Sequence, residues 1–372
     1  MFTPSDHAFM SKALQLAKKG LYTTTPNPRV GCVITRNNEI VGSGWHEKAG
    51  QPHAEINALT MAGATAQGAT AYITLEPCSH HGRTPPCADA LIRAGIARAV
   101  IAMQDPNPQV QGGGIAALKQ AGIAVQSGLM QDSAAALNAG FIKRMQQKKP
   151  WVRVKMAISL DGKTALNNGQ SQWITGEAAR RDGHHWRARS CAIMTGIGTI
   201  RADNPHLTVR HVPTPRQPRK IIIDNHLAIP IDADILKEGD TCIFTASAGN
   251  TAKIARLERM GIHVIPTERT GQEQVNLTSV MTTLAQLECN EILVEAGSAL
   301  SGALIRAGLV DELIIYMAPS LLGGSARDMF QWPEFTSLEQ KIALRMMDMR
   351  MIGRDIRIIA RLYGLTTAIP TA

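Results

Sequence analysis

PHAEINAL at residues 52–59 and TLEPCSHHGRTPPC at residues 74–87 are the two segments that decide the fold of this chain. The first opens a predicted helix beside Pro52, because proline is favoured where helices begin. The second places Pro77-Cys78 at the end of a predicted strand and Cys87 at the start of another helix. Packing of these elements around one sheet would bring an imidazole and two thiolates together.

His53, Cys78 and Cys87 therefore form a predicted zinc site. Three protein ligands leave the fourth tetrahedral position to water, which is typical of catalytic zinc. Zinc lowers the pKa of that water, so that hydroxide forms near neutral pH. Glu55, two residues after His53, is the candidate catalytic group that takes the water proton and passes it to the ring nitrogen and the leaving amine. The pattern indicates a deaminase of a small amino-substituted heteroaromatic ring.

The spacing of the two cysteines departs from the usual deaminase signature. Eight residues, SHHGRTPP, separate Cys78 from Cys87, whereas a two-residue spacer is typical of nucleobase deaminases. The alternative is that both are ordinary buried cysteines. His80 and His81 are competing candidate ligands in the same loop. Cys32 lies in an apolar strand and is expected in the core.

Length, charge and cysteine usage bound the class of protein. The 372 residues predict two domains. The net charge of +9 is spread over both halves without a long basic run, which argues against nucleic acid as the partner. No apolar run is long enough for a membrane span, and the N-terminus has no signal-peptide pattern. Six scattered cysteines argue against a disulfide framework and for the cytoplasm.

The order of predicted elements is α/β in both halves. The first half begins with a helix over 5–19 that Ser5 caps, followed by a hairpin over 29–45 with its turn at Asn37-Asn38, and it ends with a helix over 132–146. Between them, helices and strands alternate, which implies one mixed sheet covered by helices. The polar run QQKKP at 146–150 precedes a fresh strand, so we expect domains over 1–147 and 150–372.

The second half again alternates strands and helices. Its C-terminus reads as two strands around the turn Ile352-Gly353-Arg354-Asp355. The remaining expected strands cover 151–158, 192–194, 220–224, 241–245, 261–265, 291–295 and 312–318.

Long motifs along the chain resemble the bifunctional riboflavin-biosynthesis deaminase–reductase family. In the first half these are TPNPRVGCVI (25–34), PHAEINAL, TLEPCSHHGRTPPC and MQDPNPQVQGGG (103–114). In the second half they are VKMAISLDGKTA (154–165), SQWITGEAARRDGHHWRARS (171–190), GTIRADNPHLTVR (198–210) and VEAGSALSGALIRAGLVDEL (294–313). The likeness covers nearly the whole chain, and the long cysteine spacer separates this family from cytidine and tRNA deaminases.

The resemblance implies a cytidine-deaminase-like three-layer domain followed by a dihydrofolate-reductase-like domain. It implies hydrolytic deamination of a 2,5-diamino-6-ribosylamino-pyrimidinone 5′-phosphate, and then NADPH-dependent reduction of the ribosyl chain to ribityl. The implied cofactors are one zinc ion per chain and NADPH. The implied partner is the phosphorylated pyrimidine, with no nucleic acid and no membrane, and we expect a homo-oligomer.

Substrate contacts in the deaminase half follow from the same resemblance. Asn27 matches the family position that hydrogen-bonds the ring, and the alternative is a turn former between two prolines. His46, His80 and Arg83 match positions that contact the ring or the phosphate. For Arg83 the alternative is a solvated loop charge.

The reductase half is less legible from its residues alone. Gly297 and Ser298 follow a strand and open a helix, where backbone N–H groups favour an anion, although a turn without a ligand is the alternative. The resemblance places the NADPH diphosphate there, on Gly297, Ser298, Ala299, Leu300, Ser301, Gly302 and Ala303. Further implied cofactor contacts are Ala157, Trp173, Thr199, Asp203 and Asn225. Implied substrate contacts are Lys155, Ser171, Arg187, Leu207, Arg210 and Glu295.

Two pairs of charges carry separate expectations. Arg187 and Arg210 are the candidates for the substrate phosphate, because Arg forms bidentate bonds with phosphate oxygens. Lys155 and Asp161 either touch substrate or form a surface ion pair.

Two other functions compete with the bifunctional enzyme. A nucleic-acid deaminase would need a basic, aromatic-rich groove, and aromatic residues are only 4% of this chain. A zinc-stabilised structural module would be expected to lack Glu55 or to supply a fourth protein ligand.

Overall fold

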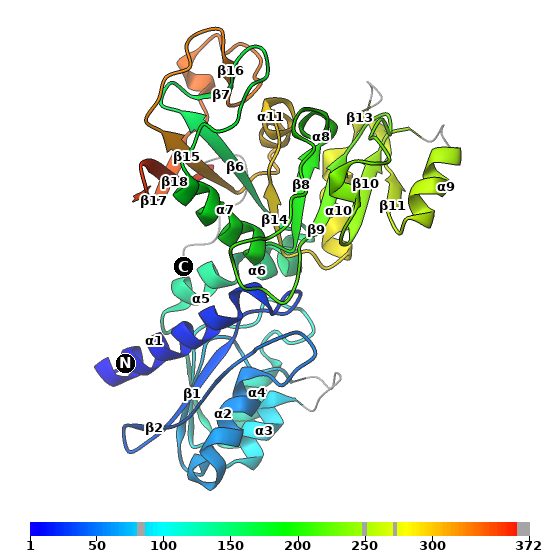
Figure 1. The fold of residues 1–372 in the computed structure, drawn as a ribbon. Helices are drawn as coiled ribbons and strands as arrows, with labels where there is room; N and C mark the ends of the chain where they lie inside the picture. Colours follow the sequence, from blue (N-terminus) through cyan, green and yellow to red (C-terminus); the bar gives the residue numbers. More distant parts are fainter. Residues whose placement is uncertain (80–85, 248–250, 271–273, 363–372) are drawn as a thin grey trace. The chain divides into compact units, whose positions relative to one another are not determined.

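The computed structural model describes residues 1–79, 86–247, 251–270 and 274–362. Contacts within it divide the chain into two compact units, Met1–Lys148 and Lys149–Ala372. Each unit has its own main sheet (Figure 1). Among the described residues, the first unit has one cluster of buried apolar side chains, and the second unit has two. No helix in the described ranges is both long and apolar enough to cross a bilayer.

The first unit is built on a mixed sheet with the strand order β2-β1-β3-β4-β5. The β1–β2 and β1–β3 pairs are antiparallel, and β3, β4 and β5 run parallel. The strands are β1 (Gly31–Arg36), β2 (Glu39–Trp45), β3 (Thr70–Ile73), β4 (Arg98–Ile101) and β5 (Ala124–Ser127). The helices are α1 (Pro4–Lys19), α2 (Ala54–Ala62), α3 (Cys87–Arg93), α4 (Gly113–Gln120), α5 (Gln131–Leu137) and α6 (Ala139–Gln147).

Glycines let helices α1 and α2 approach opposite faces of this sheet. A Cβ on Gly31 would lie 2.0 Å from the Ala13 carbonyl oxygen of α1. A Cβ on Gly42 would lie 2.3 Å from the Ala58 carbonyl oxygen of α2. Gly42 pairs with Ile34 of β1, which is three residues from Gly31 and so points to the other face. The result is a helix–sheet–helix sandwich.

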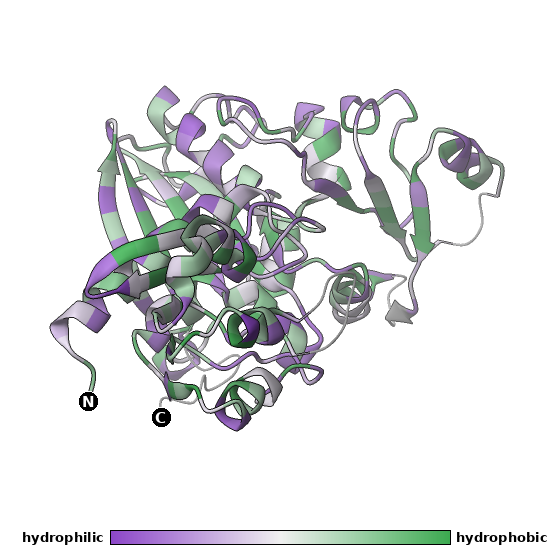
Figure 2. Ribbon diagram, turned by 90° about the horizontal axis from the view of Figure 1, so that it is seen from below, coloured by the Kyte–Doolittle hydropathy of each residue, from purple (hydrophilic) through white to green (hydrophobic). Residues whose placement is uncertain are grey.

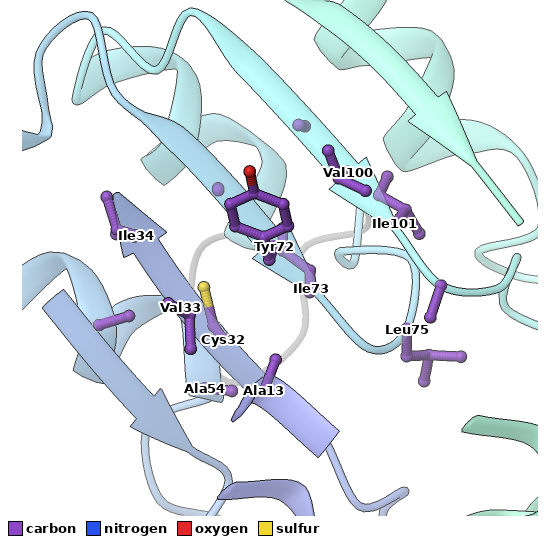
Figure 3. Close-up of a cluster of buried hydrophobic side chains, with 14 of the residues drawn as sticks. Ala13, Cys32, Val33, Ile34, Ala54, Tyr72, Ile73, Leu75, Val100 and Ile101 are labelled. Carbon is purple, nitrogen blue, oxygen red and sulfur yellow. The ribbon is translucent and has the colours of Figure 1, made fainter. Parts of the chain in front are cut away.

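The core of the first unit lies along the central strands. Figure 3 shows buried side chains of β1, β3 and β4, among them Val33 and Val100 on one face of the sheet and Ile73 on the other. These three residues are completely buried. Close packing of β1 against β3 fixes the position of the carboxyl end of β3, and Cys78 lies in the segment that follows this strand.

Two helix predictions in this unit are wrong in detail. Thr3, not Ser5, caps α1: its hydroxyl accepts from Asp6 N–H, and the Asp6 side chain accepts from Thr3 N–H. The helix expected over 132–146 is broken at Asn138. The Asn138 side chain pairs with the backbone N–H and C=O of Arg29 at 2.8 and 3.0 Å, which separates α5 from α6.

The second unit is built on a larger sheet with the strand order β11-β10-β9-β8-β14-β6-β15-β18-β17. Its pairs are parallel from β11 to β15, and the last two pairs are antiparallel. The strands in this sheet are β6 (Trp151–Ser159), β8 (Ala192–Gly196), β9 (Arg219–Ile223), β10 (Thr241–Thr245), β11 (His263–Pro266), β14 (Glu291–Val294), β15 (Glu312–Ala318), β17 (Leu344–Ile352) and β18 (Asp355–Leu362).

Helices cover this sheet, and two small ribbons stand apart from it. The helices are α7 (Glu177–Arg189), α8 (Ile197–Asp203), α9 (Thr251–Arg259), α10 (Leu277–Gln286) and α11 (Ser298–Arg306). The ribbons pair β7 (Lys163–Ala165) with β16 (Arg327–Asp328), and β12 (Arg269–Thr270) with β13 (Gln274–Val275). Figure 2 shows hydrophilic and hydrophobic stretches on the same helices, as expected of helices that pack one face on a sheet.

Candidate active sites

Three element ends of the first unit bring the predicted zinc ligands together. His53 is the N-cap of α2, Cys87 is the first residue of α3, and Cys78 follows β3. His53 Nδ1 lies 3.3 Å from Cys87 Sγ and 3.7 Å from Cys78 Sγ. All three donor atoms lie within 4.8 Å of one another. One imidazole and two thiols at this separation fit a single zinc ion with an open fourth position.

The two thiols are not equivalent. Hydrogen bonds from the Cys87 side chain and from His53 lower the pKa of Cys78 well below its ordinary value, against the opposing effect of burial. Cys87 donates that bond and is buried, so its own pKa is raised. Cys78 also accepts from the Cys87 backbone N–H at 3.3 Å. A thiolate that neighbouring protons stabilise is suited to metal binding, because a cation can take the place of those protons when it binds.

Glu55 lies in the first turn of α2 beside this cluster. Its side chain is only 3% exposed, and Oε2 has no hydrogen-bond partner among the described residues. Burial raises the pKa of Glu55 to about 7, and the nearby His53 opposes that rise. A buried carboxylate oxygen without a partner is costly unless it serves a ligand. Glu55 therefore has the geometry of a group that exchanges protons with something bound at the metal site.

Asn27 and His46 lie together beside the ligand His53. The Asn27 amide nitrogen is 3.0 Å from His46 Nε2, and the His46 and His53 rings meet edge to face at 5.1 Å. Of the predicted deaminase substrate contacts, these two are thus brought to the site. His80 and Arg83, and the competing ligand His81, lie outside the described residues.

A cavity of about 1550 Å³ opens at the carboxyl ends of β8, β9 and β14 in the second unit. This edge of a parallel sheet is where α/β proteins bind ligands. Every lining residue belongs to the second unit. The lining Lys and Arg outnumber the acids, which suits anionic ligands; they are Lys155, Arg180, Arg181, Arg187, Arg201, Arg210, Arg306 and Arg327.

Nearly all the predicted reductase residues line this cavity. They are Lys155, Ala157, Ser171, Trp173, Arg187, Thr199, Asp203, Leu207, Arg210, Asn225, Glu295, Gly297, Ser298, Ala299, Leu300 and Ala303. Ser301 and Gly302 do not line it. Ser301 is completely buried, with its hydroxyl 3.8 Å from Met156 Sδ. A Cβ on Gly302 would lie 2.6 Å from the Gln331 carbonyl oxygen, so both residues serve packing.

The expected anion turn has the predicted form. Gly297 is the N-cap of α11, and its N–H donates to Thr199 Oγ1 at 3.2 Å. The next backbone N–H groups belong to the first turn of the helix, which has no acidic residue. Asn225, in contrast, uses its side-chain oxygen to accept from the Val275 N–H at 3.0 Å, so its contact with the cavity comes with a structural role.

Lys155, Arg187 and Glu295 form the charged centre of the cavity. Glu295 accepts from Arg187 Nε and Nη2 at 2.5 and 2.9 Å. Burial alone would raise the pKa of Glu295, but Arg187 and Lys155 lower it to about 2. Burial lowers the pKa of Lys155, and Glu295 opposes that shift. The Lys155 ammonium lies 5.8 Å from the centre of the Tyr316 ring and makes no hydrogen bond in the described part of the chain, so it can donate hydrogen bonds to a ligand.

Arg187 and Arg210, the two predicted phosphate ligands, have different surroundings. The Arg187 guanidinium donates from one edge to Glu295 and from Nη1 to the Thr208 carbonyl oxygen at 3.0 Å. The Arg210 side chain is exposed at the cavity. Asp161 does not pair with Lys155; it accepts from the N–H groups of Leu322 and Gly323.

The sequence did not single out His184, which also lines the cavity. Its Nδ1 accepts from the Arg210 backbone N–H at 2.9 Å. Burial, aided by Arg187 and Arg210, lowers the pKa of His184 to about 4, so the ring is neutral near pH 7. His184 stands three residues before Arg187 on α7, and that helical spacing was a usable signal.

Two family models match the two halves of the chain. Residues 3–103 match the model described as the cytidine and deoxycytidylate deaminase zinc-binding region. Residues 150–358 match the model described as the RibD C-terminal domain. The first match spans all three candidate zinc ligands, and the second spans every cavity residue named above.

Relatives match along nearly the whole chain. The riboflavin biosynthesis protein RibD of Escherichia coli is 47% identical, with 94% of this chain and 98% of the relative covered. RibD of Haemophilus influenzae is 45% identical, with 96% and 97% covered. The solved structure of Acinetobacter baumannii RibD, form 1, has a TM-score of 0.89 at 44% identity, and the match covers 97% of this chain and 99% of that one. A deaminase/reductase structure from Thermotoga maritima has a TM-score of 0.86 at 30% identity, with 96% and 99% covered.

Proposed function

The chain belongs to the RibD family of bifunctional deaminase–reductases of riboflavin biosynthesis, and from that premise we propose how its residues divide the work. The first activity is hydrolytic deamination of 2,5-diamino-6-ribosylamino-4(3H)-pyrimidinone 5′-phosphate. The second is reduction of the ribosyl chain, which gives 5-amino-6-ribitylamino-uracil 5′-phosphate. Zinc and NADPH are the cofactors.

In the deaminase site, His53, Cys78 and Cys87 hold the metal. Bound zinc supplies the Lewis acidity that makes water a nucleophile near neutral pH. The Glu55 carboxylate takes the two protons of the attacking water in turn, giving the first to the ring nitrogen and the second to the departing amine. Its burial and its free Oε2 support this role, since the oxygen has no competing partner in the described chain. This carboxylate beside a three-donor cluster is the observation that carries the proposal.

In the reductase site, the start of α11 binds the NADPH diphosphate through the backbone N–H groups of Ser298, Ala299 and Leu300, which line the cavity. NADPH supplies the hydride. The oxygen that leaves the ribosyl carbon during reduction must gain a proton. Lys155 donates this proton, and Glu295 keeps Lys155 close to the oxygen. Burial and the free ammonium of Lys155 support this proposal.

The phosphate of the substrate is bound by Arg210. Its exposed guanidinium lies at the cavity, and His184 fixes the backbone of the residue through the 2.9 Å bond to Nδ1. Arg187 acts through Glu295, because its charge is already matched by that carboxylate.

We propose a homo-oligomer that assembles through β17. This strand is at the edge of the sheet, and only β18 pairs with it in the described part of the chain. Met346, Met349 and Met351 are 55%, 67% and 60% exposed, and long apolar edges associate with other strands. Sedimentation velocity of the wild type and Met349→Lys tests this. A wild-type monomer, or an unchanged Met349→Lys oligomer, contradicts it.

A cytoplasmic location and the absence of nucleic acid among the partners are parts of the same proposal. All six cysteines lie in the described ranges and none of them forms a disulfide, as in a reducing compartment. The dispersed charge of the sequence gives no electrostatic track for a nucleic-acid backbone.

The experiment for the proposed function follows two products in one tube. Incubated with the diaminopyrimidine phosphate and NADPH, the protein should release ammonia first and then consume NADPH. Ammonia release should persist without NADPH. Absence of ammonia from zinc-loaded protein would contradict the deaminase assignment.

A further inference from the structure

His46 is almost completely buried beside the metal ligands, and both of its ring nitrogens are engaged. Its side chain is 2% exposed. Nδ1 lies 3.2 Å from the Pro52 carbonyl oxygen, and Nε2 lies 3.0 Å from the Asn27 amide nitrogen. No nitrogen of this ring remains for a substrate.

These two contacts determine where the His46 proton resides. A carbonyl oxygen can only accept, so Nδ1 carries the hydrogen and donates it to Pro52. In the neutral ring Nε2 then has a lone pair, which accepts an N–H from Asn27. The Asn27 amide nitrogen is therefore turned toward His46, and its oxygen is turned away. Without His46, nothing in these contacts would distinguish the two orientations of the amide.

We propose that His46 is a positioning residue that fixes the orientation of the Asn27 amide, in place of the substrate contact that the family resemblance implies for it. In this orientation Asn27 presents its carbonyl oxygen and its second N–H. An acceptor beside a donor complements a donor beside an acceptor, which is the pattern on the amine and ring-nitrogen edge of an aminopyrimidinone. The inference rests on the proposed deaminase function. It states that the contact with His46 determines which edge of the substrate ring Asn27 can hydrogen-bond.

The His46 ring has a second neighbour that any test must separate. It meets the ring of the ligand His53 edge to face at 5.1 Å. A substitution could therefore act by loosening the metal and not by releasing Asn27. Zinc content, measured by atomic absorption after challenge with a chelator, distinguishes these routes without reference to activity.

His46→Phe and His46→Gln form the matched pair for the test. Phe keeps the ring and its packing on His53 but removes both hydrogen bonds. Gln carries an N–H that can donate to Pro52 and an oxygen that can accept from Asn27. His46→Phe should lower the kcat/KM of deamination by about 10- to 100-fold, the scale of a lost buried hydrogen bond. His46→Gln should recover most of this loss, and both variants should retain zinc.

A double-mutant cycle with Asn27→Ala tests whether His46 acts through Asn27. If it does, the double variant Asn27→Ala/His46→Phe should be no slower than Asn27→Ala alone, because the shared interaction is removed only once. His7→Phe makes the same substitution at an exposed histidine of the same unit and should leave deamination unchanged. Circular dichroism confirms folding of each variant.

The outcomes separate the two levels of the proposal. Additive losses in the cycle, zinc loss in His46→Phe, or failure of His46→Gln to recover activity would overturn the role of His46 while leaving the deaminase intact. A wild-type protein that releases no ammonia would overturn the deaminase function, and the role of His46 with it.

Discussion

The deaminase site and the reductase cavity solve different physical problems. In the first, the proposed chemistry uses three donor atoms within 4.8 Å of one another and one carboxylate. In the second, a cavity of about 1550 Å³ takes lining residues from Lys155 to Pro333. Activating water and moving protons needs few atoms at short range, whereas hydride transfer needs two extended molecules held in register. Single substitutions should therefore lower activity most in the first site, whereas in the second site their effects on activity should range from large to small.

Loss of a metal ligand should give the largest effect. Cys78→Ser and Cys87→Ser should each lose zinc and all measurable deamination, since a hydroxyl is a poor replacement for a thiolate ligand. Atomic absorption and ammonia release measure the two losses. NADPH consumption with the deaminated intermediate should continue. Full zinc retention in both variants would refute the ligand assignment.

In the reductase cavity, Lys155→Met should have the strongest effect. Methionine keeps the apolar stem and removes the ammonium, so kcat of reduction should fall by about 100-fold or more. The Kd for NADPH, measured by fluorescence titration, should change little. Lys237→Met, on a side chain that is 60% exposed, is the matched control. Near wild-type turnover in Lys155→Met would exclude Lys155 as the proton donor.

The two cavity arginines should differ in kind. Arg210→Ala should lower kcat/KM by about 10- to 100-fold with the phosphorylated substrate, the scale of a charged hydrogen bond. With the dephosphorylated substrate its loss should be small. Arg187→Ala should lower kcat/KM by a similar factor with the phosphorylated and the dephosphorylated substrate, because Glu295 loses its guanidinium partner in both cases. Selectivity for the phosphate in Arg187→Ala would mean that Arg187 reads the phosphate after all.

The smallest effect concerns stability of the first unit. Asp6 is buried, and the Arg98 guanidinium bound to it at 2.8 Å holds its pKa well below the usual range. A lowered folded-state pKa contributes stability above the unfolded value of about 3.9, and this is lost as pH falls further. Asp6→Asn should cost about 1–2 kcal/mol at pH 7, discounted because Arg98 is partly exposed.

Hydrogen exchange of the β3 amides measures that cost within the first unit. The difference between Asp6→Asn and the wild type should shrink as pH falls below about 4, toward the folded-state pKa. A difference that stays constant down to strongly acidic pH would mean that the Asp6 charge contributes nothing.

Local signals explain what the sequence predicted well. The hairpin turn is carried by Asn37 and Asn38, both with left-handed φ of 51° and 65°, a conformation that asparagine tolerates. Local signals at Pro52 and Pro86 place two of the candidate zinc ligands, because His53 is the N-cap of α2 and Cys87 is the first residue of α3. The sequence predicts Cys78 at the end of a strand, but β3 ends at Ile73, so Cys78 lies in the segment that follows the strand. The Thr3–Asp6 capping box is also a local signal, but Ser5, which lies close to it and is itself a common capping residue, is predicted as the cap instead.

Long-range partners explain what the sequence did not predict. Asn138 breaks a helix because it bonds to Arg29, far away in the chain. Arg187 is tied to Glu295 across 108 positions, so its charge could not be known to be neutralised. The β7–β16 ribbon likewise joins segments that only tertiary packing brings together. Ser301 and Gly302 belong to the segment predicted to bind the cofactor diphosphate, but their positions on helix α11 direct them into the core and not into the cavity.

Glu55→Gln tests most directly whether one chain holds two separate sites. The variant should keep its zinc and lose deamination by at least about 100-fold, the scale of acid–base catalysis. Supplied with the deaminated intermediate, it should consume NADPH at the wild-type rate, because every cavity residue belongs to the other unit. Deamination at the wild-type rate would eliminate Glu55 as the proton carrier. Loss of both activities in a folded, zinc-loaded variant would contradict the separation of the two sites.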